Sequence, residues 1–536
     1  MDEKIIDKSS HMNAAVNVQM KELLQSLSDT TKFDSLGLYN KQSLNAYLQT
    51  EHELVFTNKK SFTNSASKLK TFIDTTCKFY GLFPKAYHQE QLTALQNQLE
   101  SDAIEKSNAV QWAKAELLMT DAFFQLIKHI RNGQLYKDSS NVYYDSTLTN
   151  QYLVPNLQQF NENPEELDSL LALLEPQFPD YDSLKMYLKN ILENQVAFES
   201  NSFTKLSYPI KDSVQFLKQF IQRIQEEGLS MGNVQDIDSI QLKNLIKSYQ
   251  QKHHYKEDGI WSKELIENMN ATGNSNFVKI AISLDRFRQL SIPHEGQYVL
   301  VNIPSFALRA YNQDQVAVES KVVVGRVGTK TPIMESEISD IIIMPQWFVP
   351  PSILRLPGYI ERKRRNPNYI VRGKSVIQKS GPGNALGKCK FNFESSDAIY
   401  LHDTNEKWAF GASKRALSHG CVRVQSYEAL ANFLSSMTPL VEKNYKKVKD
   451  KIKKISSSGD TSYTYKYVVK DSLVHNQDAV SDMFHHSGHH ELELSKKIPV
   501  YITYMTCAVR NGMLVHYADV YAYDSQLQKN YIEPYL

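Results

Sequence analysis

Ser418-His419-Gly420-Cys421-Val422-Arg423 is the stretch that decides what kind of domain this chain contains. Cys421 follows His402, in the segment Tyr400-Leu401-His402-Asp403-Thr404, by 19 positions. A free thiol has a pKa of about 8.5, and a neighbouring imidazole activates it by stabilising the thiolate. Glycine at 420 lets the backbone approach a substrate, so that the amides of Gly420 and Cys421 can face an oxyanion. The stretch predicts acyl transfer with Cys421 as nucleophile and His402 as base.

The two segments together resemble the catalytic motif of the YkuD-type L,D-transpeptidases, in which a histidine leads into Ser-His-Gly-Cys-hydrophobic-Arg. The resemblance implies that a stem tetrapeptide is cut after its third residue, D-alanine leaves, and a thioester is passed to an acceptor amine as a 3-3 peptidoglycan crosslink. It also implies acylation by β-lactams, carbapenems in particular. Peptidoglycan stem peptides and glycan are the expected partners, the cell envelope or periplasm is the expected location, and no metal or organic cofactor is expected.

Further site residues follow from the motif and its neighbours. His419 is expected to line the oxyanion hole with its backbone. Arg423 lies two residues past the sulfur, so it can share a strand face with Cys421 and hold a carboxylate or a backbone carbonyl. Either a backbone carbonyl or the carboxylate of Asp403 can orient His402. Four more residues are candidate substrate contacts, with core or salt-bridge roles open for the last two: Ser418, Trp347, Tyr400 and Arg415.

Three other interpretations of the motif stay open. A hydrolase can use the same two residues to trim tetrapeptides or to cut crosslinks, with water in place of the acceptor amine. A cell-wall-binding scaffold protein can carry the motif without using it. An inert buried thiol describes most cysteines, but serine, two histidines and an arginine around one cysteine are unusual in an apolar core.

Composition bounds the remaining possibilities. A chain of 536 residues predicts three or four domains at about 150 residues each. A net charge of +2 does not indicate a nucleic-acid partner. The cysteines (Cys77, Cys389, Cys421 and Cys507) lack disulfide or zinc spacing. No apolar run is long enough for a transmembrane segment, and charged residues stand where a signal peptide would be apolar. We therefore expect a mature or truncated form.

The predicted fold class is α+β and multidomain. It comprises a mostly antiparallel β catalytic domain (a YkuD-like sandwich), an all-α scaffold domain and a small three-helix peptidoglycan-binding module. The expected order is a lead-in (1–35), the scaffold (36–235), the module (236–272), a bridging helix (273–295), the catalytic domain (296–440) with a capping insertion (about 351–395), a Lys-rich helix and His-rich loop (441–497), and a closing β-hairpin with tail (498–536).

Two helical regions carry these domain predictions. Leu117, Leu118, Ala122, Phe123 and Leu126 form one apolar stripe at helical spacing. The turn Tyr80–Pro84 and the segment Leu118–Ala122 are similar to the scaffold of the large L,D-transpeptidases. The module is similar to a peptidoglycan-binding domain through a shared set of turn and cap residues, although an ordinary helical hairpin would fit too: Gln250, Gln251, Asp258, Gly259, Ser262 and Asn270.

Strand patterns mark the second half of the chain. Short β-branched runs at Tyr298–Pro304, Val316–Val318, Lys321–Gly325 and Ile341–Met344 predict antiparallel strands. The insertion is basic, and a run of charges usually marks a solvated face. The family resemblance implies instead that an insertion here caps the active site, where its arginines can gather substrate carboxylates as a lid.

The C-terminal region has three expected parts. Val441, Tyr445, Val448, Ile452 and Ile455 have the spacing of an amphipathic helix. The cluster His485, His486, His489 and His490 predicts a loop, with metal binding as the alternative. A hairpin with strands at 500–504 and 515–521 is expected around Asn511-Gly512.

Overall fold

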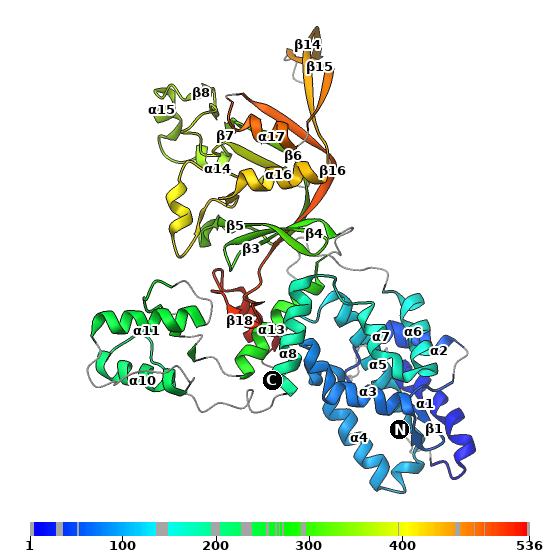
Figure 1. Cartoon of the computed structure of the whole chain (residues 1–536). Coiled ribbons are helices and arrows are strands. Elements are labelled where there is room, and N and C mark those ends of the chain that lie inside the picture. Colours follow the sequence, from blue (N-terminus) through cyan, green and yellow to red (C-terminus); the bar gives the residue numbers. More distant parts are fainter. Residues whose placement is uncertain are drawn as a thin grey trace. The chain divides into compact units, whose positions relative to one another are not determined.

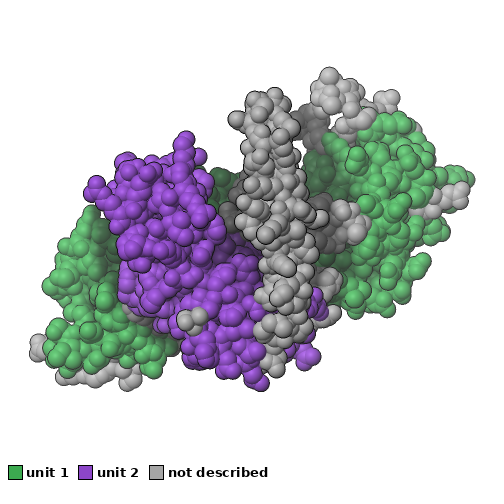
Figure 2. All heavy atoms as spheres, turned by 90° about the horizontal axis from the view of Figure 1, so that it is seen from above, with its two compact units in different colours: residues 1–292, 505–536 green, residues 293–504 purple. Residues whose placement is uncertain are grey.

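A computed structural model of the chain shows two compact units, residues 1–292 with 505–536 and residues 293–504 (Figures 1 and 2). It describes residues 5–27, 36–50, 53–135, 148–193, 204–226, 238–252, 257–262, 265–266, 269–270, 273–290, 296–394, 396–455, 461–475, 477–486 and 488–532. Among the helices of these ranges, none combines the length and the hydropathy that a membrane span requires.

The first unit is built around one buried helix, α5 (Ala109–Asn132). The Asn108 side chain accepts a hydrogen bond from the Val110 amide at its start, and Gly133 ends it with a φ of +83°. The other helices of this unit are α1 (Met12–Leu27), α2 (Lys41–Gln49), α3 (Asn64–Asp74), α4 (Gln89–Ser101), α6 (Asn150–Glu162), α7 (Leu167–Ala172), α8 (Pro179–Glu193), α10 (Ser213–Glu226), α11 (Ser239–Lys252), α13 (Gly273–Arg288) and α18 (Tyr523–Leu527).

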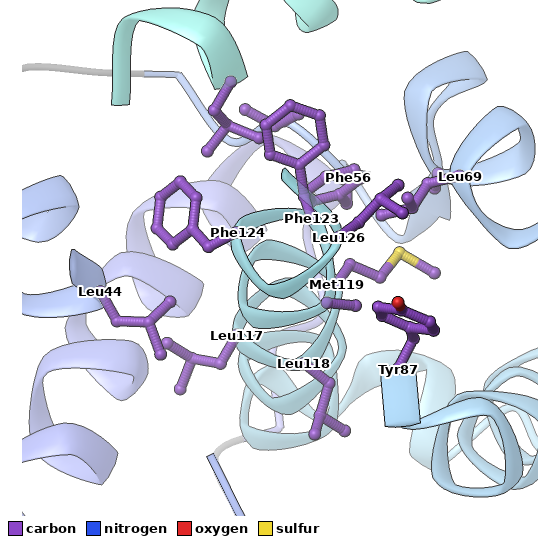
Figure 3. Packing of buried hydrophobic residues seen from close by; sticks show 14 of the residues in the cluster. Leu44, Phe56, Leu69, Tyr87, Leu117, Leu118, Met119, Phe123, Phe124 and Leu126 are labelled. Carbon is purple, nitrogen blue, oxygen red and sulfur yellow. The ribbon is translucent and has the colours of Figure 1, made fainter. Parts of the chain in front are cut away.

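Side chains leave α5 in every direction and meet its neighbours (Figure 3). Phe123 stacks on Phe160 of α6 with ring centroids 5.1 Å apart, and both side chains are buried. Leu44 of α2 and Leu69 of α3 belong to the same core. The predicted apolar stripe is therefore one part of a helix that is buried on nearly all sides.

Three segments expected outside the scaffold pack into this unit. The predicted loose lead-in is wrong for α1, because Met12, Val16 and Met20 are buried in the core around α5. The predicted bridging helix is α13, which packs against α5 and α8. The hairpin of β17 (Cys507–Arg510) and β18 (Met513–His516) also packs on α8 and α13.

A small helical cluster forms from α10, α11 and the helical residues 265, 266 and 269. Trp261 packs edge-on against Phe216 and Phe220 of α10. The Asn270 side chain both accepts from the Leu206 amide and donates to its carbonyl, each at 2.7 Å. The cluster begins near residue 206, so the predicted boundary at 235 runs through it. The three-helix peptidoglycan-binding module itself stays a prediction.

The second unit contains a large, mostly antiparallel sheet in the order β15-β14-β16-β3-β4-β5-β13-β11-β10-β6. Its strands are β3 (Tyr298–Asn302), β4 (Ala307–Asn312), β5 (Gln315–Gly325), β6 (Met334–Ile343), β10 (Cys389–Phe393), β11 (Ser396–His402), β13 (Val422–Val424), β14 (Leu440–Ile455), β15 (Thr461–His475) and β16 (His490–Thr503). Strand β12 (Ala416–Ser418) pairs with β5.

The sheet closes on itself, because β6 pairs with β16 as well as with β10. Two pairs of adjacent strands in the order above are parallel: β16 with β3, and β11 with β13. Helix α16 (Tyr427–Met437) packs against β5 and β16, and α17 (Gln477–Met483) packs against α16. The predicted strand runs of the catalytic domain all lie in this sheet.

The predicted capping insertion is a small layer of its own. It contains α14 (Pro351–Leu354), α15 (Tyr359–Arg364), β8 (Tyr369–Arg372) and β9 (Ser375–Gln378). Strand β9 pairs with β8 and with β7 (Trp347–Phe348), which gives a three-stranded sheet.

Two predictions for the C-terminal region are wrong. Residues 440–455 form strand β14 and not an amphipathic helix, because pairing with β15 along its length overrides the helical spacing of its apolar residues. The hairpin turns at Asn511-Gly512 as expected, but its strands are β17 and β18. Residues 500–503 belong instead to β16, which pairs with β3.

The packing around α5 generates a stability prediction. Phe123→Ala should lower the free energy of unfolding of the helical unit by about 3–5 kcal/mol, because it leaves a cavity beside Phe160. Leu173, with 81% of its surface exposed, provides the matched control, and Leu173→Ala should change this free energy by less than about 0.5 kcal/mol. Urea dependence of amide hydrogen exchange in α5 measures both, and equal effects would contradict the assigned core.

Candidate active site

Two adjacent parallel strands assemble the candidate site. Leu401 of β11 pairs with Val422 of β13, and His402 pairs with Arg423. Leu401 and Val422 are fully buried. Since successive side chains of a strand point to opposite faces, the residues on either side of this apolar pair share the other face. These are Tyr400 and His402 on β11, and Cys421 and Arg423 at β13.

A tight turn before β13 presents the half-buried Cys421. The Ser418 hydroxyl donates to the Cys421 carbonyl at 2.6 Å and accepts from the Gly420 amide at 3.1 Å. Gly420 has a φ of +125°, a conformation that favours glycine. Ser418 is therefore a structural residue of the turn, which corrects its predicted substrate role. The predicted oxyanion role of the Gly420 amide is also wrong for this structure, because that amide already has an acceptor.

His402 is a buried, neutral base. Its Nδ1 hydrogen-bonds to the Asp403 carbonyl, and since a carbonyl can only accept, Nδ1 carries the proton and Nε2 carries the lone pair. Burial, helped by the positive charge of Arg423, lowers the pKa of His402 to about 3. Of the two orienting groups left open by the sequence, the structure uses the backbone carbonyl.

Cys421 rests as a thiol. Burial raises its pKa above the ordinary value, and hydrogen bonds from the Tyr400 hydroxyl and backbone amide oppose that rise. The charges of Lys390 and Arg423 oppose it too. Burial of both groups therefore favours a neutral thiol and a neutral imidazole over the expected pair of thiolate and imidazolium. The proton has to leave the sulfur as the sulfur attacks.

Tyr400 contacts the sulfur from the neighbouring strand. Its hydroxyl hydrogen-bonds to Cys421 and also to the Trp347 side chain, whose indole N–H can only donate. The Tyr400 ring lies 5.5 Å from the His402 ring, and the Lys390 ammonium lies 4.2 Å from the Tyr400 ring centroid. Since Trp347 belongs to β7, its hydrogen bond connects the sheet of the capping insertion to the thiol.

The side chain of Asp403 fixes the turn that follows His402. Its buried carboxylate accepts from the Lys388 amide at 2.9 Å and from the Lys407 ammonium. A Cβ atom at Gly387 would lie only 2.2 Å from this carboxylate, so only glycine fits there. Asp403 thus holds its own carbonyl in place for His402.

Arg415 has a structural role, and the side chain of His419 points to solvent. Arg415 donates to the carbonyls of Val322, Ala412 and Phe306 at 3.0–3.2 Å. It is a structural clamp, which corresponds to the core role that the sequence left open beside substrate contact. The His419 side chain is exposed, and partial burial together with the charges of Arg326 and Arg423 lowers its pKa.

Sequence reasoning missed the segment that follows Asp403. Glu406 forms an ion pair with Arg423 at 2.6 Å, and the next residue, Lys407, binds Asp403. Trp408 is 68% exposed although its neighbours Ala409 and Phe410 are buried against Val323. The adjacent acid and base directly after the histidine motif were the available signal.

The His-rich segment does not gather into a metal site. His489 hydrogen-bonds to Glu491 and His490 to Glu442. Within the ranges that the structure describes, no group of three or more His, Cys, Asp or Glu side chains is arranged to hold a metal ion.

Comparisons with known proteins identify two domains in the chain. Residues 296–443 match the family of L,D-transpeptidase catalytic domains (YkuD), and residues 41–188 match the Scaffold domain family. A curated protein of Haemophilus influenzae, named "Putative L,D-transpeptidase", is 27% identical over 318 residues, which cover 54% of this chain and 57% of that protein. The match thus spans little more than half of the relative. The chain carries a YkuD-type L,D-transpeptidase catalytic domain and a Scaffold domain, which confirms the resemblance drawn from its motifs.

Among the solved structures that match is the "Structure of the Ldtfm-avibactam carbamoyl enzyme". The sequence identity is 15%, and the match covers 24% of this chain and 40% of that chain. Its TM-score of 0.15 is too low to support any statement about the fold.

The resting thiol generates a pH prediction. Because burial raises the pKa of Cys421, its alkylation by iodoacetamide should still accelerate above pH 9. Tyr400→Phe removes a hydrogen bond to the thiolate and should slow alkylation at pH 8 about tenfold. Tyr369→Phe, in the capping insertion, is the matched control and should leave the rate unchanged. A wild-type rate that levels off near pH 7 would show a preformed thiolate instead.

Proposed function

We propose that this chain is an L,D-transpeptidase that forms 3-3 crosslinks between peptidoglycan stem peptides through a thioester on Cys421. The observation that carries the proposal is the shared face of β11 and β13, where Tyr400, His402, Cys421 and Arg423 lie together. The matched catalytic domain supplies the reaction class. The geometry supports a sequence of two proton transfers through one imidazole.

In the first step, the Cys421 sulfur attacks the carbonyl of the third residue of a donor tetrapeptide, and His402 Nε2 takes the thiol proton. The negative charge moves to the carbonyl oxygen, and we assign its stabilisation to the backbone of His419 and Cys421. The C–N bond to D-alanine then breaks, and His402 returns the proton to the departing amine. A thioester remains on the enzyme.

In the second step, an acceptor amine attacks the thioester carbonyl. His402 removes a proton from the amine and gives it to the sulfur as the C–S bond breaks, so the thiol and the neutral imidazole are both restored. Arg423 is assigned a substrate carboxylate. The capping insertion, with Trp347 hydrogen-bonded to Tyr400, is assigned the exclusion of water. We also assign carbapenems as inhibitors that acylate the same sulfur.

The helical cluster is assigned to peptidoglycan binding. Gln250 accepts from the Gly259 amide at 2.8 Å and donates to Asp258 at 2.9 Å, and Ser262 accepts from the Leu265 amide at 3.0 Å. These contacts give a structural role to Gln250, Asp258 and Ser262, three of the residues on which the resemblance to a peptidoglycan-binding domain rests. A cell-envelope location follows from the proposed substrate.

Product analysis tests the proposal. The purified chain, incubated with disaccharide tetrapeptide, should yield 3-3 crosslinked dimers and free D-alanine by mass spectrometry. His402→Gln should lower the rate about 10²- to 10⁴-fold, the range for loss of a general acid–base group. Cys421→Ala should give no product and no carbapenem adduct.

Cys77→Ala is the matched control, because Cys77 is buried in the other unit, and this variant should keep both dimers and adduct. Tripeptides without dimers would show a hydrolase. Binding to sacculi with neither turnover nor adduct would show a cell-wall-binding protein.

A further inference from the structure

Arg423 is held by an acid of the same chain. Its Nη1 donates to a Glu406 carboxylate oxygen at 2.6 Å, and the two side chains form an ion pair. The Arg423 side chain is 17% exposed, and its Nε is buried without a hydrogen-bond partner among the described residues. A guanidinium presents donors in a planar fork that matches a carboxylate with two bonds. Here Glu406 uses only part of that fork.

Arg423 lies where the donors of its guanidinium that Glu406 does not use can bind a ligand. Arg423 stands on the same strand face as Cys421 and pairs with His402 across the two strands. Its charge acts on both groups, because it lowers the pKa of each. A carboxylate bound to Arg423 would therefore belong to a ligand whose other atoms can reach the sulfur.

Glu406 is suited to be displaced. Its side chain is 48% exposed, and ion pairs open to water contribute little stability. Its backbone, in contrast, is held in place: the Glu406 amide donates to Thr404 at 3.1 Å, and Lys407 is bound to Asp403. Ala409 and Phe410 are buried against Val323. The side chain can move away while the segment stays.

We propose that Glu406 is an internal stand-in for a ligand carboxylate: it occupies Arg423 in the resting enzyme and gives way to a carboxylate of the incoming peptide. The site thereby favours anionic peptides over neutral ones, and it keeps the half-buried guanidinium paired until such a peptide arrives. The preference for anionic peptide substrates rests on the proposed function. The binding of an anion at Arg423, near Cys421, does not depend on it.

Paired alkylating reagents test the anion site without any peptidoglycan substrate. Iodoacetate and iodoacetamide both form an S–C bond at Cys421 and release iodide, but only the first carries a carboxylate. Their rate ratio cancels changes in thiol pKa and access. In Glu406→Gln the iodoacetate-to-iodoacetamide ratio should rise about three- to fivefold, the value of a solvent-exposed ion pair. Glu394→Gln, which removes an equal charge paired with Lys497, should leave the ratio unchanged.

A double variant tests whether the effect of Glu406 acts through Arg423 or through the overall electrostatic potential of the site. Arg423→Gln should lower the ratio, and adding Glu406→Gln to it should produce no further rise. An unchanged ratio in Glu406→Gln, or a rise that persists without Arg423, would overturn the proposal. With tetrapeptide as donor, Glu406→Gln should lower KM and leave kcat unchanged. If crosslinking fails in every form while the alkylation ratio behaves as stated, the proposed function falls and the anion site stands.

Discussion

The parallel pairing of β11 with β13 is the constraint on which the site depends. It aligns Leu401 with Val422, and these two side chains enter the core together. Tyr400, His402, Cys421 and Arg423 are consequently placed together on the opposite face. A slip of one residue would exchange the faces and bury the nucleophile. The fully apolar pair therefore secures the register of the reactive side chains.

Burial then decides the charge state of that face. Removing a charged imidazole from water is costly, and the cations Arg423 and Lys390 add to that cost, so His402 stays neutral. The same two cations favour a thiolate at Cys421, against the burial that raises its pKa. The resting site is thus an uncharged acid and base surrounded by positive charge. Such a setting stabilises the negative charge that develops during attack.

The sequence predicted the strand runs of the catalytic domain. It also singled out Cys421 and His402, which the paired strands β11 and β13 place on one face. Both inferences depend on local residue types and alternation. Sequence reasoning failed, or left alternatives open, where a partner distant in sequence decides the outcome. Pairing with β15 made residues 440–455 a strand despite their helical spacing. Ser418 and Arg415 have the chemistry of ligand-binding residues, but backbone groups take their donors. The sequence did not single out Glu406, because its role depends on the ion pair with Arg423, which only the structure shows.

The central claim is that an uncharged His402, with its proton on Nδ1, stands on the same strand face as the thiol of Cys421. Selective ¹⁵N labelling of histidine, with His402→Gln for assignment, measures this directly by NMR. The account predicts the ring signals of a neutral Nδ1–H imidazole from pH 8 down to about 4, with titration near 3. An imidazolium at pH 7, or a proton on Nε2, would contradict it.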